Sequence, residues 1–285
     1  MSSSAIREIA MTGATIALDL SPCHGVEAVR RAGSVLAERV EADLLGLAAL
    51  RPSTAIAGDG YAAGELIAIN RDAAAANLGR AKLAFMAAGD GEARREWRSS
   101  ISFDSPASWI IAEARGADLI VASPESPKDP DSAARGARAI DLVMGSGRPV
   151  MLAPAEGRCL GFGTAILAWK DTRETRRAAL DAAPFLRLFD RVVVLAVAHR
   201  DASKVVAQQL SSVVGWLVRH GIATELRQEE EAHDATVELV AQIEELQADL
   251  VVAGAYGRPR MSAWVLGGVT CDYLLHPDRC VLLSH

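Results

Sequence analysis

The chain has 285 residues, of which 50% are hydrophobic, and a formal net charge of -6. A domain usually contains roughly 100–200 residues, so two domains are expected. Without clustered Lys and Arg, nucleic acid and anionic membranes are not expected partners. The first residues lack the basic start and apolar stretch of a secretory signal, and no run of about 18 apolar residues occurs, which predicts a cytoplasmic protein without a membrane segment.

Strand-like and helix-like segments alternate along the whole chain. Short runs rich in β-branched residues and Leu predict strands at 14–19, 43–49, 96–100, 118–123, 149–153, 164–169, 191–198, 223–228, 249–254 and 280–284. Helical patterns fill the gaps between them. This alternation is typical of βαβ units, and it predicts an α/β fold with a parallel sheet covered on both faces.

Several local signals mark the helices. Ser105 followed by Pro106 predicts an N-cap and a first helical residue, and Asp234 is the matching N-cap further along the chain. The stretch 201–220 predicts a helix that ends before Gly221. Its predicted buried face consists of Val205, Leu210, Val213, Val214 and Leu217. The acidic run 229–231 is interpreted as a solvated turn before the next helix.

The sequence repeats itself. ADLIVASP at 117–124 matches ADLVVAGA at 248–255, and the same shift places RPVMLAP (148–154) over RCVLLSH (279–285). This register predicts two copies of one five-stranded Rossmann-like unit, spanning 1–155 and 156–285 and joined by the Gly-rich segment 155–163. Exposed final strands would leave apolar edges, so we expect an internal pseudo-dimer, with a further homodimer left open.

The strongest motif is DLVVAGAYGRPRMSAWVLGGVT at 249–270. Its strand ends at Gly254, Gly257 follows, nine residues intervene, and Gly267-Gly268 then opens into helical sequence. Glycines allow backbone N–H groups to converge and a ligand to approach closely, and a helix N-terminus favours an anion. The position after a strand favours phosphate binding, although a tight turn and close helix packing would explain the same glycines. Neither a Walker A loop nor GxGxxG occurs.

The Gly-x-x-Gly, nine residues, Gly spacing resembles the ATP-binding signature of the universal stress protein family. The ADLVVAG lead-in and the closing VLLS strand are also similar to that family, so the resemblance covers nearly the whole chain as a tandem pair. It implies a five-stranded parallel sheet in each unit. It also implies an adenine nucleotide between the first and fourth strands, and pairing of units through the fifth strand.

The resemblance assigns residues in the second copy. The phosphate site would be lined by Gly254, Gly257, Gly267 and Gly268. The family more often has Ser or Thr at the position of Gly268. The backbone near Val197 would read adenine. The family favours an acid after its first strand, where the second copy has Lys170 and the first copy has Asp19. Lys170 is suited to bind phosphate oxygens as a point charge, and the alternative is an exposed ion pair with Asp171 or Glu174.

The first copy departs from the motif. Ser123 replaces the first loop glycine and Ser126 the second, and SPESPKDPDSAARG adds three prolines and several acids. Proline has no N–H to donate, and carboxylates repel phosphate. The first copy is therefore predicted to be degenerate, with nucleotide bound weakly or not at all.

Other residue classes give no second site. The four cysteines and six histidines have no zinc-ligand spacing, so free thiols and surface histidines are expected, with His199 following a strand. The five tryptophans are interpreted as core or interface residues: Trp97, Trp109, Trp169, Trp216 and Trp264.

Three functions stay open. The leading hypothesis is a non-enzymatic or very slow binder of ATP or another adenine nucleotide, with Mg²⁺ accompanying it, which reports adenylate state to an unidentified regulatory protein. The alternatives are an interaction module that binds no nucleotide, and a slow nucleotide hydrolase. No general base or Mg²⁺-binding carboxylate pair is identifiable for the third.

Overall fold

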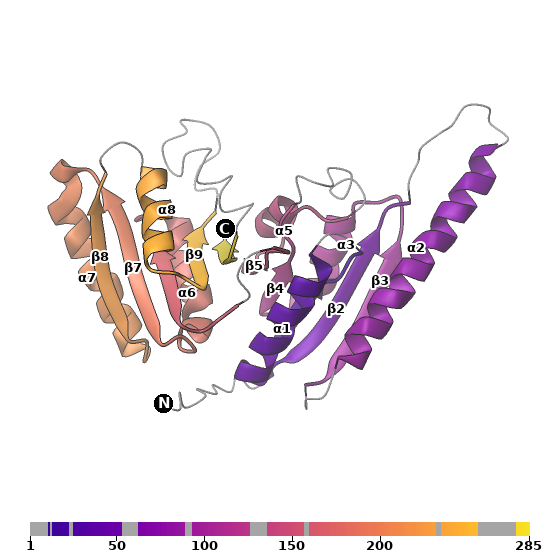
Figure 1. Ribbon diagram of the computed structural model, residues 1–285, viewed down its shortest axis with the longest axis horizontal. Coiled ribbons are helices and arrows are strands. Elements are labelled where there is room, and N and C mark those ends of the chain that lie inside the picture. The colour runs from indigo at the N-terminus through magenta and orange to yellow at the C-terminus, as the bar shows by residue number, and fades with distance from the viewer. Residues whose placement is uncertain are drawn as a thin grey trace.

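The computed structural model describes residues 11, 13–22, 25–52, 62–88, 93–125, 136–156, 160–231, 235–255 and 278–285. Strands and helices alternate along the chain (Figure 1). The strands are β1 Thr15–Asp19, β2 Asp43–Leu50, β3 Arg95–Ile101, β4 Leu119–Ala122, β5 Val150–Leu152, β6 Thr164–Ala168, β7 Arg191–Ala198, β8 Thr224–Glu230, β9 Leu250–Gly254 and β10 Cys280–Ser284. The α-helices are α1 Val26–Val40, α2 Ala62–Ala87, α3 Pro106–Glu113, α5 Ala139–Gly145, α6 Arg173–Leu186, α7 Ser203–Arg219 and α8 Ala235–Glu245.

The described strands form one ten-stranded sheet in the order β3-β2-β1-β4-β5-β10-β9-β6-β7-β8. All neighbours are parallel except β5 and β10, which pair antiparallel with Leu152 opposite Val281. Each half of the sheet therefore repeats the order of the other. The predicted α/β class and the pairing of two five-stranded units through their last strands are confirmed.

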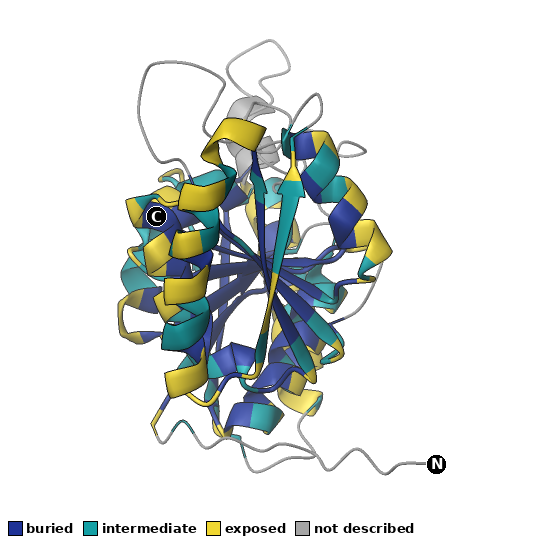
Figure 2. Cartoon of the chain, turned by 90° about the vertical axis from the view of Figure 1, so that its left-hand side faces the viewer, coloured by how far each residue is buried: buried dark blue, intermediate teal, exposed yellow. Residues whose placement is uncertain are grey.

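Helices cover both faces of this sheet. The interior of one face lies under α1, α2, α6 and α7, and the other lies under α3, α5 and α8. Figure 2 shows the buried strands between helices whose outer sides are exposed. The eight inner strands are almost entirely apolar because parallel strands covered on both faces leave few positions for water, whereas the edge strands β3 and β8 are mostly polar and only partly buried.

Contacts across the junction join the two halves. The described end of the segment predicted as a linker, residues 160–163, packs closely against Asp249. The Gly163 N–H donates to the Asp249 carboxylate at 2.9 Å, and a Cβ on Gly161 or Gly163 would lie within 3.0 Å of an oxygen of that carboxylate. The guanidinium of Arg39, in α1, lies 4.7 Å from the ring centroid of Phe162. Such cation–π contacts are worth about 0.5–1 kcal/mol. These glycines therefore serve close packing, while the division of the chain at 155/156 stays a prediction.

Two local predictions are wrong. Val205 was expected on the buried face of α7, but it is 60% exposed, because it lies in the first turn of that helix, away from the core. The acidic run was expected to form a turn, but Glu229 and Glu230 belong to β8. Their charges are accommodated because β8 is an edge strand, where ion pairs with Arg227 and Arg200 are possible.

Other local predictions hold. The Ser105 hydroxyl accepts a hydrogen bond from the Ser108 N–H, and Pro106 is the first residue of α3. The predicted N-cap Asp234 lies outside the described residues.

Candidate functional site

The strand order reverses direction at two places. In the first half, β1 lies between β2 and β4, and in the second half, β6 lies between β7 and β9. Ligands of open parallel sheets bind at the carboxyl ends of the strands at such switch points. Of the predicted site residues, Lys170, Val197 and Gly254 lie at these ends in the second half, whereas Gly257, Gly267 and Gly268 lie outside the described residues.

Gly254 packs directly against a helix. A Cβ at this position would lie 2.4 Å from the backbone nitrogen of Thr175 and 2.5 Å from the carbonyl carbon of Glu174. Both residues belong to the first turn of α6. Because backbone atoms cannot rotate away, any other residue would displace the helix. Close packing is thus sufficient to explain this glycine.

In the first half, the glycine of the equivalent contact lies before the helix instead of at the end of the strand. Ser123 follows β4 at the position that Gly254 holds in the second half, and it faces Gly25, where a Cβ would lie 2.1 Å from the Ser123 hydroxyl oxygen. Gly25 has φ of 94°, which side chains rarely adopt. The glycine thus lies on the helix side in one half and on the strand side in the other.

The backbone at the end of β7 extends beyond its neighbour. The last paired residues of β6 and β7 are Ala168 and Leu195, and the Leu195 carbonyl then accepts a hydrogen bond from the Trp169 N–H at 2.7 Å. Val197 lies past this point, with its other edge paired to β8. Its half-buried side chain packs against the core on the α8 face, as does that of Ala168.

The equivalent backbone in the first half is already hydrogen-bonded. The Leu20 N–H donates to the Leu47 carbonyl, as the Trp169 N–H donates to the Leu195 carbonyl. Leu47 therefore corresponds to Leu195, and Ala49, two residues later, corresponds to Val197. The Ala49 N–H donates to the Ser21 hydroxyl at 3.1 Å, and that hydroxyl donates to Asp19 at 2.6 Å.

Asp19 is buried without a cationic partner among these contacts. The Ser21 backbone N–H donates a second hydrogen bond to the same carboxylate oxygen at 3.1 Å. Burial raises the pKa of Asp19 to about 6, although both hydrogen bonds from Ser21 act in the opposite direction.

The sheet register corrects the expected position of Lys170. Ala17 pairs with Ile120 in the first half, and Ile166 pairs with Val251 in the second. Ile120 and Val251 are equivalent in the repeat, so Asp19 corresponds to Ala168, and Lys170 corresponds to Ser21. The second half therefore has alanine, and no acidic side chain, in the place of Asp19. The sequence match was misleading because it carried no information on which strand residues pair.

Lys170 is exposed and interacts electrostatically with Glu231 at the strand ends. Desolvation lowers its pKa, and the negative charge of Glu231 opposes that shift. Glu231 also lies 3.3 Å from the ring of His199. Asp171 and Glu174, the partners expected as alternatives, are ion-paired to Arg176 and Arg173. The role of Glu231 was missed because the acidic run read as a solvated turn.

Glu174 places a buried carboxylate beside Gly254. Burial disfavours its ionisation, but hydrogen bonds from its own backbone N–H and from Thr172, together with the charge of Arg173, hold its pKa below the ordinary value. This carboxylate therefore occupies the N-terminus of α6. It would repel a phosphate placed there without a cation.

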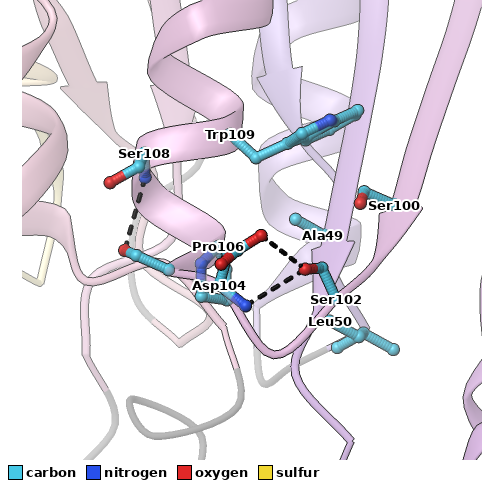
Figure 3. Close-up of a pocket in the computed structure, with 9 residues that line it drawn as sticks. Ala49, Leu50, Ser100, Ser102, Asp104, Pro106, Ser108 and Trp109 are labelled. Carbon is cyan, nitrogen blue, oxygen red and sulfur yellow. Dashed lines mark hydrogen bonds between the residues drawn. The ribbon is translucent and has the colours of Figure 1, made fainter.

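The first half contains a pocket of about 270 Å³ at the ends of β2 and β3, lined by both polar and apolar residues (Figure 3). Ser102 donates to the Asp104 carboxylate at 2.9 Å and accepts from the Asp104 N–H at 3.1 Å, with the Trp109 ring on the opposite side. These polar groups satisfy one another. The pocket thus presents little that would select a ligand.

No group of three potential metal ligands gathers in the part of the chain that the structure describes. Among the same residues, no helix is long and apolar enough to cross a membrane.

Comparison with known proteins gave structural matches only: no protein-family model and no curated protein matches the sequence. A universal stress protein from Archaeoglobus fulgidus DSM 4304 is similar with a TM-score of 0.72 and 14% identity, over 95% of each chain. A putative universal stress protein from Pseudomonas aeruginosa UCBPP-PA14 has a TM-score of 0.57 and 16% identity, over 98% of this chain and 93% of that one.

A third similar structure, a protein of unknown function from Pseudomonas aeruginosa PAO1, has a TM-score of 0.54 and 17% identity, over 98% of this chain and 92% of that one. Identities this low establish a shared fold. Since the matches span almost the whole chain and the sheet shows the repeated strand order, the protein has the universal stress protein fold in a tandem arrangement.

Proposed function

We propose that this protein is a universal stress protein that binds an adenine nucleotide in its C-terminal half and reports adenylate state to a regulatory partner. The observation that carries the proposal is the difference between the two switch points. In the N-terminal half, the Ala49 N–H donates to the Ser21 hydroxyl, whereas the C-terminal half has Lys170, which carries no hydroxyl, at the position of Ser21 beside the backbone of Val197. Adenine has matching donor and acceptor edges for such a backbone segment.

The remaining contacts follow from the sequence motif. Gly257, Gly267 and Gly268 would supply backbone N–H groups to the phosphates. Lys170, exposed at the end of β6, would add a positive charge. Mg²⁺ would enter with the phosphates, which supply much of its coordination, and would offset the charge of Glu174. The role of Gly254 in this site is to let α6 approach the strand end.

A second function is favoured by one observation. Because helix packing alone accounts for Gly254, the glycine spacing is weaker support for phosphate than the sequence suggested. An interaction module that binds no nucleotide is consistent with this contact. The two functions differ in whether purified protein binds nucleotide at all.

Thermal unfolding with ATP, ADP or AMP tests the proposal. Ligand at about 100 times its dissociation constant adds about 2.7 kcal/mol of stability, a melting shift of several degrees. Gly257→Val should abolish the shift, and Ser126→Val, at the matching place in the first copy, should preserve it. No shift in the wild type, or loss only in the Ser126 variant, would favour the interaction module.

Lys170→Ala tests the phosphate contact separately. A point charge on phosphate is worth about 1–2 kcal/mol, so ATP affinity should fall roughly tenfold while adenosine affinity changes little. Lys204→Ala is the matched control, since Lys204 is also exposed but lies on α7. Isothermal titration calorimetry measures both affinities. Equal losses for ATP and adenosine would show that Lys170 does not contact phosphate.

Steady release of phosphate from ATP would separate binding from hydrolysis. Turnover that survives further purification and is lost in Gly257→Val would support a slow hydrolase. Without such turnover, the nucleotide acts as a bound regulatory ligand.

A further inference from the structure

A groove of about 500 Å³ lies between α6 and α7. It exists because these helices cover different strands: α6 packs mainly over β9 and β10, and α7 packs over β7 and β8. The intervening strand, β6, ends between them. Trp169, the first residue after β6, lines this gap. Ligand sites of small molecules usually measure about 300–1,000 Å³, so the groove has room for one.

The body of the groove is apolar and contains two indoles. Trp169 is only 9% exposed, and its indole N–H has no hydrogen-bond acceptor among the described residues. Trp216 lines the same groove, and its ring centroid lies 4.3 Å from that of His220, with the two ring planes tilted by 39°. A buried N–H without a partner is costly, and a ligand acceptor that reached the groove floor would supply one.

Leu180 and Val213 complete the apolar body from the two helices. Leu180 is 56% exposed, which is unusual for a leucine beside two tryptophans. Covering it with an apolar ligand would remove this surface from water, and burial is favourable at about 25 cal/mol per Å².

One end of the groove is polar. Arg176 donates two hydrogen bonds to a single Asp171 oxygen, at 2.7 and 3.0 Å. The amide of Gln209 approaches the other Asp171 oxygen at 3.4 Å. This group supplies donors on flexible, mostly exposed side chains. Arg176 is able to exchange Asp171 for the carboxylate, sulfonate or carbonyl of a ligand, because guanidinium binds such groups in a planar, bidentate way.

We propose that the groove binds a small amphipathic molecule with a planar aromatic body and one anionic or carbonyl head group. The rings would lie between Trp169 and Trp216, and the head group would lie at Arg176 and Gln209. This site is distinct from the adenine position of the proposed nucleotide site, although Lys170, which is proposed to contact the phosphates, is the chain neighbour of Trp169 and Asp171. Trp169 packs into the core under α6 and α7, whereas Val197 packs on the opposite face, under α8.

The two halves differ at this position. The residue equivalent to Trp169 is Leu20, since each donates its N–H to the neighbouring strand in the same way. Leu20 is 1% exposed and is absorbed into the core of the first half. The second half therefore carries a large aromatic ring where the first half has an aliphatic side chain.

Fluorescence titration of the full chain with 8-anilinonaphthalene-1-sulfonate tests the proposal, since this probe has planar rings and one anionic head. We expect saturable binding of one probe per chain. Ser212→Trp, on the exposed side of the groove, should weaken binding by about tenfold or more. Ser211→Trp should leave it unchanged. The control is closely matched, because both serines are exposed and donate to the carbonyl four residues earlier.

A second pair of variants guards against disturbed folding. Leu180→Asp puts a charge in the apolar body and should also weaken binding, while Val205→Asp, equally exposed but outside the groove, should not. Near-UV circular dichroism checks that each variant keeps its tertiary structure. Adding ATP should not displace the probe.

Three results would overturn the proposal. The first is non-saturable binding, or binding that all four variants reduce alike. The second is full affinity in both Ser212→Trp and Leu180→Asp. The third is displacement by ATP in wild type, which would place the probe in the nucleotide site.

Discussion

The two halves share their strand order but differ at the carboxyl ends of their central strands. In the first half, Ser21 connects the buried Asp19 to the backbone of Ala49, and Gly25 lies against Ser123. In the second half, Ala168 and Lys170 take the places of Asp19 and Ser21, while β7 runs past β6 as far as β2 runs past β1. The fold thus tolerates two versions of the same place, one in which a serine connects an acid to the backbone and one with alanine and lysine at those positions. Which version forms depends on a few side chains rather than on the sheet.

Substituting the glycine of this helix–strand contact is expected to cause the largest loss of stability, and the glycine differs between the halves: Gly254 follows the strand in one, and Gly25 precedes the helix in the other. Gly254→Ala would force a Cβ against the backbone of α6, and overpacking of this kind costs about 3 kcal/mol. Gly25→Ala should cost less, about 2 kcal/mol, because its neighbour is the movable hydroxyl of Ser123 and because its φ is positive. Urea unfolding measures both losses.

A compensating substitution is expected to work in the first half and to fail in the second. Ser123→Gly should recover part of the loss in Gly25→Ala by removing the obstructing hydroxyl, with the backbone strain remaining. No side-chain change at Thr175 should rescue Gly254→Ala, because the obstructing atoms there belong to the backbone. Equal rescue in the two halves would contradict the exchange.

The buried carboxyl of Asp19 predicts a pH dependence confined to the first half. Its pKa of about 6 exceeds the ordinary value of 3.8, so the folded state binds more protons between these pH values. Stability from this group therefore rises as pH falls from about 6 toward 4, and it is lost as pH rises. Linkage limits the effect to about 3 kcal/mol.

Asp19→Asn should remove this contribution, because the amide does not titrate and its oxygen still accepts from Ser21. Urea unfolding of wild type and variant from pH 4 to 7 measures the difference in slope. The exposed Asp72→Asn is the control. An unchanged slope in Asp19→Asn would mean that Asp19 keeps an ordinary pKa in the folded chain.

The periodicity of the sequence predicted the architecture well. Each of the ten strands lies within two residues of its expected bounds at every end. For the eight inner strands the reason is that buried parallel strands are apolar runs that contrast sharply with the helices between them. The repeat also predicted the junction. Equivalent final strands, MLAP and LLSH, had to cover each other's edges, and β5 and β10 do so.

The site was predicted less well, for physical reasons. A glycine permits close packing or ligand approach equally, and only the distance from Gly254 to Thr175 shows that packing operates here. Lys170 was aligned with Asp19 because sequence similarity does not reveal strand register, which pairs Asp19 with Ala168. Glu231 acts on Lys170 across a strand end, and no local pattern indicates such a contact.

The smallest effect concerns a feature that the halves share. Arg98 of β3 binds Glu96 and Glu113, and Arg227 of β8 binds Glu229 and Glu245, so each edge strand is tied to a helix. Exposed pairs of this kind contribute about 0.2–1 kcal/mol each.

We expect Arg98→Ala and Arg227→Ala to destabilise the chain by similar, small amounts, and less at high salt, because screening weakens exposed pairs. The double variant should show the sum of the two losses, since the arginines lie on opposite edge strands of the sheet and share no partner. Urea unfolding at low and high salt measures these terms. A loss several times larger in one half would show that its edge depends on ion pairs where the other does not. The halves would then differ in how their outer strands are held as well as at their switch points.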